Sequence, residues 1–544
     1  MNTDICPRAE PENHPRSSVL SVVRFFLWIV SLGGTLLSAG RAADFLFAEA
    51  TIDSLQARMA AGTLSAHELT AAYLARIAAV DNAGPTLNAI IELNPDALAI
   101  ADALDAERKS GRVRGPLHGI PVLIKDNIAT ADKMETTAGS LALVGAKPPH
   151  DAALVTRLRE AGAVILGKTN LSEWANFRST TSTSGWSGRG GLTHNPYALD
   201  RNASGSSSGS AVAVAANLCV VAVGTETDGS IVSPASISGI VGLKPTVGLV
   251  SRTGIIPISA SQDTAGPMAR TVRDAAILLS VIAGADANDA ATSARPSSAT
   301  IDPASALATG ALKGARIGIV RGPFKFHPRM DARLTEMVAV LRAAGAEIVD
   351  PLEMPIVDQL GKPEGVVLHY EFKAGLNAWF ASLGPTAPVK SLAELITFDE
   401  THRDREMPFF GQEELIAAQA KGPLTEPAYL EALALSRKLA RTDGIDATMD
   451  PHKLDALVAL TSGPAWFTDP VNGDQYTGDT TTLAAVAGYP HITVPAGDVF
   501  GLPIGVSFVG RAWSEAKLIA FAADYEARTH ARREPKFLPT IPLP

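Results

Sequence analysis

Short apolar runs alternate with helical segments along most of this chain, and that alternation restricts the possible folds more than any other feature. The runs are four to six residues long, are typical of buried strands, and occupy residues 121–124, 163–166, 219–223, 315–320, 457–460, 491–494 and 504–508. Helical patterns occupy residues 211–217, 333–343 and 514–527. Strands that alternate with helices predict an α/β fold with a largely parallel or mixed sheet.

The composition permits a large core and disfavours one class of partner. Of the 544 residues, 46% are apolar and 19% are charged, which suits a buried core and argues against global disorder. The net charge is −9 and the chain has no long basic run. Because nucleic-acid-binding proteins carry basic patches, we expect no nucleic-acid partner.

The N-terminus has the pattern of an export signal. Arg16 and Arg24 precede an uncharged apolar stretch at residues 25–37, and small residues follow at 38–40 and 42–43. The stretch has 13 residues, whereas a membrane-spanning helix needs about 20. We therefore predict a signal peptide at residues 1–42, cleavage after Ala42, and a periplasmic or secreted protein without stable membrane insertion. An uncleaved membrane anchor is the alternative.

The sequence gives little support for cysteine chemistry or for a metal site. Cys6 and Cys219 cannot form a disulfide framework, and Cys219 lies in an apolar run that predicts an unreactive core residue. The eleven histidines are scattered, with no His-Glu-x-x-His pattern and no cysteine pair, so we expect no metal site.

One nucleotide-binding pattern is present by coincidence. Gly162, Gly167, Lys168 and Thr169 satisfy the G-x-x-x-x-G-K-T formula. In a true phosphate-binding loop, the four intervening residues form an open curve after a strand. Here they are the apolar residues 163–166, which are predicted to be the strand itself.

Three segments together suggest nucleophilic catalysis. Lys125 ends an apolar run and is followed by Asp-Asn; a buried lysine is readily neutral and can act as a general base. Residues 204–210 are Ser-Gly-Ser-Ser-Ser-Gly-Ser, and Asp228-Gly229-Ser230 follows the run at 219–223. A serine on a tight bend beside backbone N–H groups suits a nucleophile with an oxyanion hole. Singly, each segment also fits an ordinary strand-end lysine or a hydroxyl-rich loop.

In combination, these segments resemble the amidase signature family of serine hydrolases. The family pattern has a lysine before Asp-Asn, a Gly-Ser-Ser loop, and a serine after Asp-Gly or Gly-Gly, followed by Pro-Ala. Further similar segments occur in family order at residues 167–173, 239–246, 266–268, 488–490 and 494–497. The resemblance covers residues 52–528. It implies an α/β amidase signature fold, with a large mixed, mostly parallel twisted sheet covered by helices on both faces, as one catalytic domain at residues 43–544.

The resemblance also implies roles for individual residues. Ser230 is the expected nucleophile, Ser206 the bridging serine that follows a cis peptide bond from Gly205, and Lys125 the base; the family separation of 24 residues selects Ser206. Ser207 is expected to support the loop. The expected oxyanion-hole donors are the backbone N–H groups of Thr227, Asp228, Gly229 and Ser230. The implied reaction hydrolyses a carboxamide to a carboxylate and ammonia through an acyl-enzyme, without a metal or an organic cofactor.

The substrate class is less constrained. Within the family, residues 174–178, 204–217, 225–232, 465–469 and 471–474 are most similar to bacterial peptide amidases, which remove the C-terminal amide of peptides. Many relatives have Gly where this chain has Asp228 and Arg where it has Val232, and losing that arginine disfavours small acidic substrates. The alternatives are an amidase for aryl, aliphatic or fatty acyl amides, a glutamine amidotransferase subunit that works with partner subunits and transfer RNA, and a non-catalytic binding protein. The oligomeric state stays undefined.

Overall fold

The computed structural model describes residues 45–542, apart from residues 305–308, 323–326 and 386. Within this part of the chain, one sheet has the strand order β1-β3-β2-β6-β8-β7-β12-β13-β11-β9-β10. In that order the strands are Ile90–Leu93, Val164–Thr169, Pro121–Lys125, Val221–Glu226, Thr264–Ala269, Val241–Lys244, His491–Val499, Leu502–Val509, Ala456–Leu460, Arg316–Val320 and Glu347–Leu352. A small hairpin pairs β4 (Trp186–Ser187) with β5 (Gly191–Leu192). All seven predicted strands are therefore confirmed, with ends that shift by a few residues.

The sheet is mixed, as predicted, but parallel pairs do not dominate it. Among the described strands, β3, β2 and β6 run parallel to one another, and so do β11, β9 and β10. The other six neighbouring pairs are antiparallel. The expected parallel majority came from the alternation of strands with helices, whereas β12 and β13 are joined by a short turn that makes them antiparallel.

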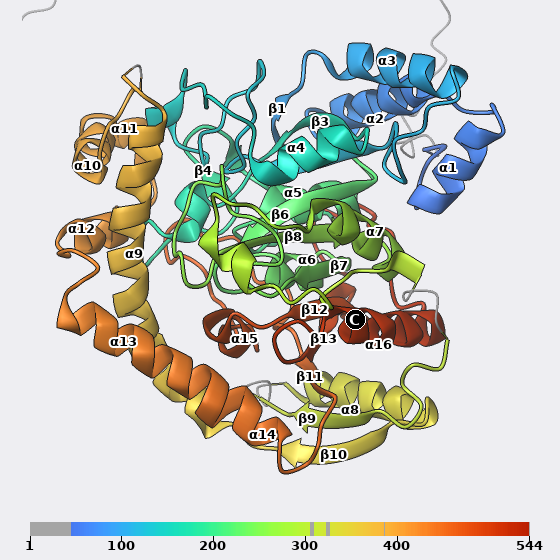
Figure 1. Ribbon diagram of the computed structural model, residues 1–544, viewed down its shortest axis with the longest axis vertical. Helices are drawn as coiled ribbons and strands as arrows, with labels where there is room; N and C mark the ends of the chain where they lie inside the picture. Colours follow the sequence, from blue (N-terminus) through green and yellow to red (C-terminus); the bar gives the residue numbers. More distant parts are fainter. Residues whose placement is uncertain (1–44, 305–308, 323–326, 386, 543–544) are drawn as a thin grey trace, which may run out of the picture. The chain divides into compact units, whose positions relative to one another are not determined.

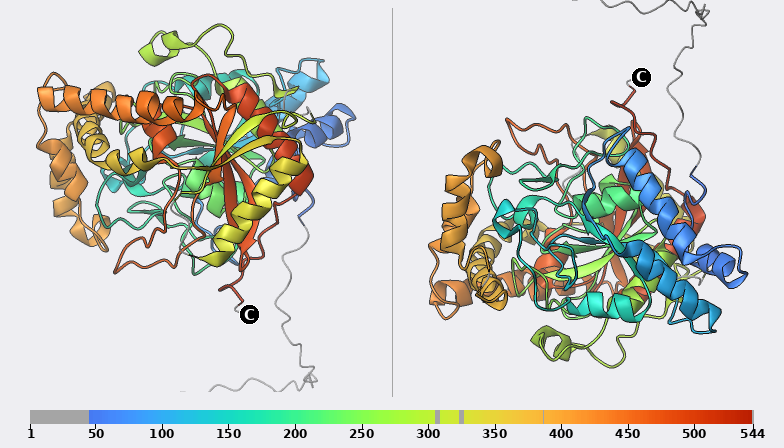
Figure 2. Two further views of the ribbon diagram at one scale, coloured as in Figure 1. Left: turned by 90° about the horizontal axis from the view of Figure 1, so that it is seen from below. Right: turned by 90° about the horizontal axis from the view of Figure 1, so that it is seen from above.

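Helices cover both faces of the sheet, which explains why the central strands β3, β2, β6, β8 and β7 are buried along their whole length (Figures 1 and 2). On one face, α5 (Ser208–Ala215) and α6 (Val232–Ile237) pack together, and Ser236 accepts a hydrogen bond from the N–H of Gly505 in β13. On the other face, Phe508 of β13 contacts Tyr525 of α16 (Glu515–Thr529), which also packs on α7 (Val272–Ile282) and α8 (Pro328–Ala343).

The remaining helices lie at the ends and one side of the sheet (Figure 1). Those near the start of the chain are α1 (Ile52–Ala60), α2 (Ala66–Val80), α3 (Ala97–Lys109) and α4 (Ala153–Glu160). A helical cap follows β10 and consists of α9 (Gly361–Ser382), α10 (Leu392–Thr401), α11 (Arg403–Glu406), α12 (Glu413–Gln419) and α13 (Pro427–Arg437). The short helix α14 (Ala447–Met449) leads from the cap to β11, and α15 (Thr482–Ala487) lies between β11 and β12.

Local sequence signals explain several of these boundaries. Helix α2 begins at a capping box, in which Ser65 accepts a hydrogen bond from the N–H of Glu68 and the Glu68 carboxylate accepts one from the N–H of Ser65. Helix α5 begins three residues earlier than predicted, at Ser208, so the serine-rich segment itself forms the first helical turn.

Cys219 is buried and burial raises the pKa of its thiol to about 12, as expected of an unreactive core residue.

Residues Phe47–Pro544 form one compact unit. The predicted signal peptide at residues 1–42 lies outside the described residues and stays a prediction. Apart from the gaps given above, residues 45–542 contain no helix with the length and apolar character needed to cross a membrane.

Candidate active site

Lys125 ends strand β2, where its side chain is completely buried among hydroxyl groups. Its Nζ lies 2.6 Å from Ser206 Oγ, 3.1 Å from Ser207 Oγ and 2.9 Å from Thr225 Oγ1, and it donates to the Thr225 carbonyl at 3.2 Å. Asn127 adds a hydrogen bond from its Nδ2 to Thr225 Oγ1. These contacts hold the amine in one place and aim it at Ser206.

Burial also changes the proton affinity of this amine. Burial lowers the pKa of Lys125 to about 7, and the carboxylates of Glu226 and Asp263 oppose that shift. A large share of the lysine is therefore neutral near pH 7. A neutral amine hydrogen-bonded to a serine hydroxyl can accept its proton.

The Gly205–Ser206 peptide bond is cis, as the resemblance implied. The adjoining segments pack tightly around it, because a Cβ at position 205 would lie 2.1 Å from Ser172 Oγ. Ser207 connects the three segments of the site, since its hydroxyl donates to the Thr225 carbonyl and its N–H donates to the Ser230 carbonyl at 3.1 Å. These contacts lie within the catalytic loops, and the supporting role of Ser207 stays a prediction.

Ser230 follows a tight loop between β6 and α6. Gly229 has a φ of +73°, a conformation that favours glycine at this bend. The carboxylate of Glu226 accepts hydrogen bonds from the N–H groups of Ile231 and Val232 and so fixes the exit of the loop. Within the described part of the chain, the N–H groups of Thr227, Asp228 and Ser230 donate no hydrogen bond, so they are available to a ligand.

A cavity of about 380 Å³ is lined by Ser230 together with Gly205 and the loop at 227–229. Trp466 and Asp474, from segments noted in the sequence, also line it, as does Tyr476. None of the described lining residues is a lysine or an arginine. The cavity therefore offers carboxylate, hydroxyl and aromatic groups around Ser230, and no cation for a substrate carboxylate.

Asp228 is held from a distant part of the chain. Thr481 Oγ1 lies 2.6 Å from Asp228 Oδ1 and 2.8 Å from Asp479 Oδ1, so its single hydroxyl proton is shared between the two carboxyl groups. Burial raises the pKa of Asp228 well above its ordinary value, and the Glu364 and Asp479 carboxylates add to the rise. No sequence motif pointed to Thr481 or Asp479, because they lie about 250 residues from Asp228 in the chain.

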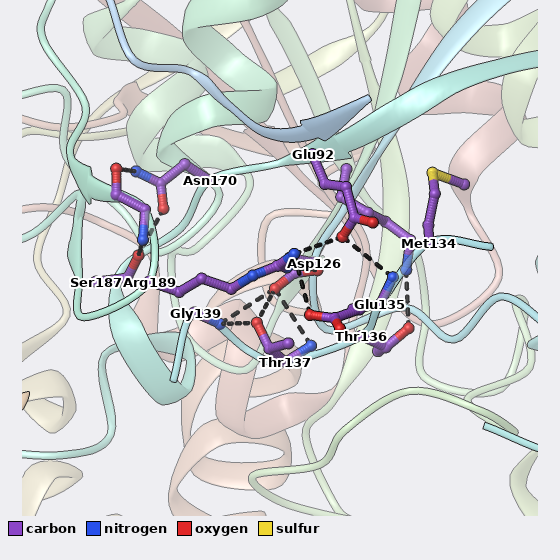
Figure 3. A network of polar contacts seen from close by, with 12 residues as sticks. Glu92, Asp126, Met134, Glu135, Thr136, Thr137, Gly139, Asn170, Ser187 and Arg189 are labelled. Carbon is purple, nitrogen blue, oxygen red and sulfur yellow. Dashed lines mark hydrogen bonds and ion pairs between the residues drawn. The ribbon is translucent and has the colours of Figure 1, made fainter. Parts of the chain in front are cut away.

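A polar network surrounds Asp126, the residue that follows Lys125 in the chain (Figure 3). The Asp126 carboxylate accepts hydrogen bonds from the hydroxyl and N–H of Thr137 and from the N–H of Gly139. Arg189 lies 3.7 Å from Asp126 Oδ1 and also pairs with Glu92 at 2.6 Å and with Glu135 at 3.2 Å. This network anchors the backbone next to Lys125.

The residues of the apparent nucleotide-binding motif lie in the sheet next to the active site. Residues 164–169 form strand β3, so the four intervening residues are indeed strand and not a phosphate-binding loop. Lys168 is buried and donates to the Ile128 carbonyl and to Thr136 Oγ1. Thr169 pairs with Ser210 at 2.7 Å and links β3 to helix α5.

Comparisons with known proteins agree with this geometry. The family model described as Amidase matches residues 68–519. The chain belongs to the amidase family. As a member, it is a serine amidohydrolase with the amidase signature fold, an enzyme that acts on carboxamides.

Three relatives illustrate the range within the family. The solved peptide amidase from Stenotrophomonas maltophilia is 56% identical, with a TM-score of 0.87 over 91% of this chain and 99% of that one. A probable amidase of Arabidopsis thaliana is 43% identical over 91% of this chain and 93% of its own length. A glutamyl-tRNA(Gln) amidotransferase subunit from Chloroflexus aurantiacus is 39% identical over 89% of this chain and 98% of its own length.

Proposed function

We propose that this amidase removes the C-terminal amide of peptides, with Ser230 as nucleophile, Ser206 as bridging serine and Lys125 as base. The contact of 2.6 Å between a buried lysine of lowered pKa and Ser206, beside the cavity that Ser230 lines, carries the catalytic part of the proposal. The likeness to the Stenotrophomonas maltophilia peptide amidase supports the substrate class.

The proposed reaction moves one proton along a chain of three groups. Neutral Lys125 takes a proton from Ser206, which takes one from Ser230, and Ser230 Oγ forms a bond to the carboxamide carbon. Backbone N–H groups of Thr227, Asp228 and Ser230 stabilise the resulting oxyanion, whereas the N–H of Gly229 bonds to the Glu226 carboxylate. The carbon–nitrogen bond then breaks, the leaving nitrogen receives the proton held by Lys125, and ammonia departs. Water attacks the acyl-enzyme by the same route and releases the carboxylate and Ser230.

The lining of the cavity supports an amidated peptide over a substrate with a free carboxylate. The cavity contains no described lysine or arginine, while Asp474 and Asp479 add negative charge. A peptide amide has replaced its terminal carboxylate by a neutral group and so avoids this repulsion. Val232 at the start of α6 is likewise apolar where many relatives have an arginine.

The substrate class is tested by ammonia release from the purified full-length protein. We expect kcat/KM for C-terminally amidated dipeptides to exceed that for benzamide, hexadecanamide and L-glutamine by at least about tenfold. A tenfold ratio corresponds to a difference of about 1.4 kcal/mol in activation free energy. The unamidated dipeptides serve as a blank, since they release no ammonia by this reaction. A preference for the aryl or fatty amide would assign the other amidase class, and a preference for L-glutamine would favour the amidotransferase role.

A further inference from the structure

Three consecutive residues with side chains adopt the left-handed conformation beside the active site. Trp174, Ala175 and Asn176 have φ values of +49°, +54° and +72°. Residues other than glycine rarely adopt this conformation, and a run of three needs surrounding contacts that hold it in place. Such local strain is most often found where a protein positions a functional group.

A buried ion pair closes this turn from both ends. Arg178 Nη1 lies 2.5 Å from Glu173 Oε1, and both side chains are almost inaccessible to solvent, at 0% and 1% exposure. The Arg178 guanidinium also donates to the Glu406 carbonyl and, through Nε, to the Gly411 carbonyl. The Glu173–Arg178 pair, hereafter the clasp, thus joins the turn to the helical cap.

Aromatic rings complete the surroundings of the guanidinium. Arg178 Cζ lies 5.5 Å from the ring centre of Trp186 and 4.9 Å from that of Phe410. Two further carboxylates, from Glu406 and Asp399, are buried nearby. Burial and the Glu406 carboxylate raise the pKa of Asp399 to about 8. Burial also raises the pKa of Glu173 well above its ordinary value, and the Arg178 guanidinium opposes that rise.

The turn presents its tip to the substrate cavity. Ala175, Asn176 and Phe177 line the same cavity as Ser230. Asn176 is exposed, and within the described residues its side chain makes no hydrogen bond. A carboxamide side chain has one carbonyl acceptor and two N–H donors, so it can pair with both polar groups of a peptide bond.

We propose that the clasp holds residues 174–176 in the left-handed conformation so that the Asn176 carboxamide binds the substrate's peptide group next to the scissile amide. Asn176 is then a specificity-determining residue, and Glu173 and Arg178 are positioning residues. This inference rests on the proposed peptide amidase function. It explains how one enzyme can distinguish a peptide amide from a simple amide, which has no second peptide group.

Asn176→Gly tests the binding contact, because glycine keeps the left-handed backbone and removes only the side chain. The measurement is kcat/KM for an N-acetylated dipeptide amide and for p-nitrophenyl butyrate, an activated ester without a peptide group. We expect the ratio of amide to ester kcat/KM to fall at least fivefold, mainly through a higher KM for the amide. Asn288→Gly, an exposed asparagine outside the cavity, is the control. A smaller fall in the ratio would overturn the role of Asn176.

The clasp is tested by rescue. Glu173→Gln keeps the shape of the side chain but replaces the carboxyl group that faces Arg178 by a carboxamide, and we expect the same ratio to fall at least fivefold. Adding Ala175→Gly to this variant should restore the ratio at least threefold, because glycine adopts the left-handed conformation without the clasp. A purely structural defect would not be corrected at position 175, so absence of rescue would refute the clasp. If Glu173→Gln does not fold, Asn176→Gly still decides the inference.

The experiments distinguish failure of the proposed function from failure of the inference about Asn176. If the unchanged protein prefers simple amides to dipeptide amides, then the peptide amidase proposal is wrong and the contact at Asn176 has no substrate to bind. If the unchanged protein prefers dipeptide amides but Asn176→Gly keeps the full preference, then only the present inference is wrong.

Discussion

Replacing Ser230 by alanine is expected to lower kcat at least ~1,000-fold, the scale on which hydrolases lose activity with their nucleophile. The substitution removes the oxygen that forms the acyl-enzyme and leaves the loop in place, because the contacts of this loop run through Glu226 and the Ser230 carbonyl. The thermal unfolding midpoint should therefore change little. Ammonia release from a dipeptide amide and a melting curve measure the two effects together.

Ser280→Ala is the matched control for this test. Ser280 lies in helix α7 away from the cavity, where its hydroxyl donates to the Ile277 carbonyl. Ser280→Ala should keep turnover within about twofold, since surface substitutions away from special features are usually small in effect. Retention of more than a tenth of the activity by Ser230→Ala would show that another group attacks the amide.

Replacing Lys125 by methionine is the second large effect that we expect, with a loss of about 10²–10⁴-fold in kcat, the usual contribution of a general base. Methionine fills most of the buried space and cannot accept a proton from Ser206. The unchanged enzyme should also show kcat/KM rising with pH, because only the neutral amine is a base and burial lowers the pKa of Lys125 to about 7. The rise should level off above that pKa.

The pH profile distinguishes a catalytic lysine from a structural one. In Lys125→Met, the residual activity should no longer rise through pH 7, because the titrating group is gone. A variant that keeps the same rise, or a full-length enzyme whose kcat/KM is flat between pH 6 and 8, would place the base elsewhere.

Structural features that depend on neighbouring residues were predicted from the sequence. Lys125 ends an apolar strand and Ser230 follows an Asp-Gly bend, so both structural positions were predicted from neighbouring residues, whereas their catalytic roles came from the family resemblance and stay a proposal. The capping box at Ser65 likewise depends only on neighbouring residues. The cis bond at Ser206 came from the family resemblance and from no local rule.

Where the site depends on distant residues, the sequence carried no comparable signal. Thr481 supports Asp228 from the start of α15, and Arg178 contacts carbonyl groups of the cap more than 200 residues away. The proportion of parallel strands was also missed, since pairing between distant strands is set by the order of the whole sheet. Such contacts exist only after folding, when separate loops converge on one cavity.

The most direct test of the account is the covalent intermediate itself. Full-length protein mixed with p-nitrophenyl butyrate and quenched in acid during turnover should gain the mass of one butyryl group by intact-protein mass spectrometry. Peptide mapping should place that group on Ser230, and Ser230→Ala should gain no mass. An adduct on a different residue, or turnover without any adduct at short quench times, would contradict Ser230 as the nucleophile.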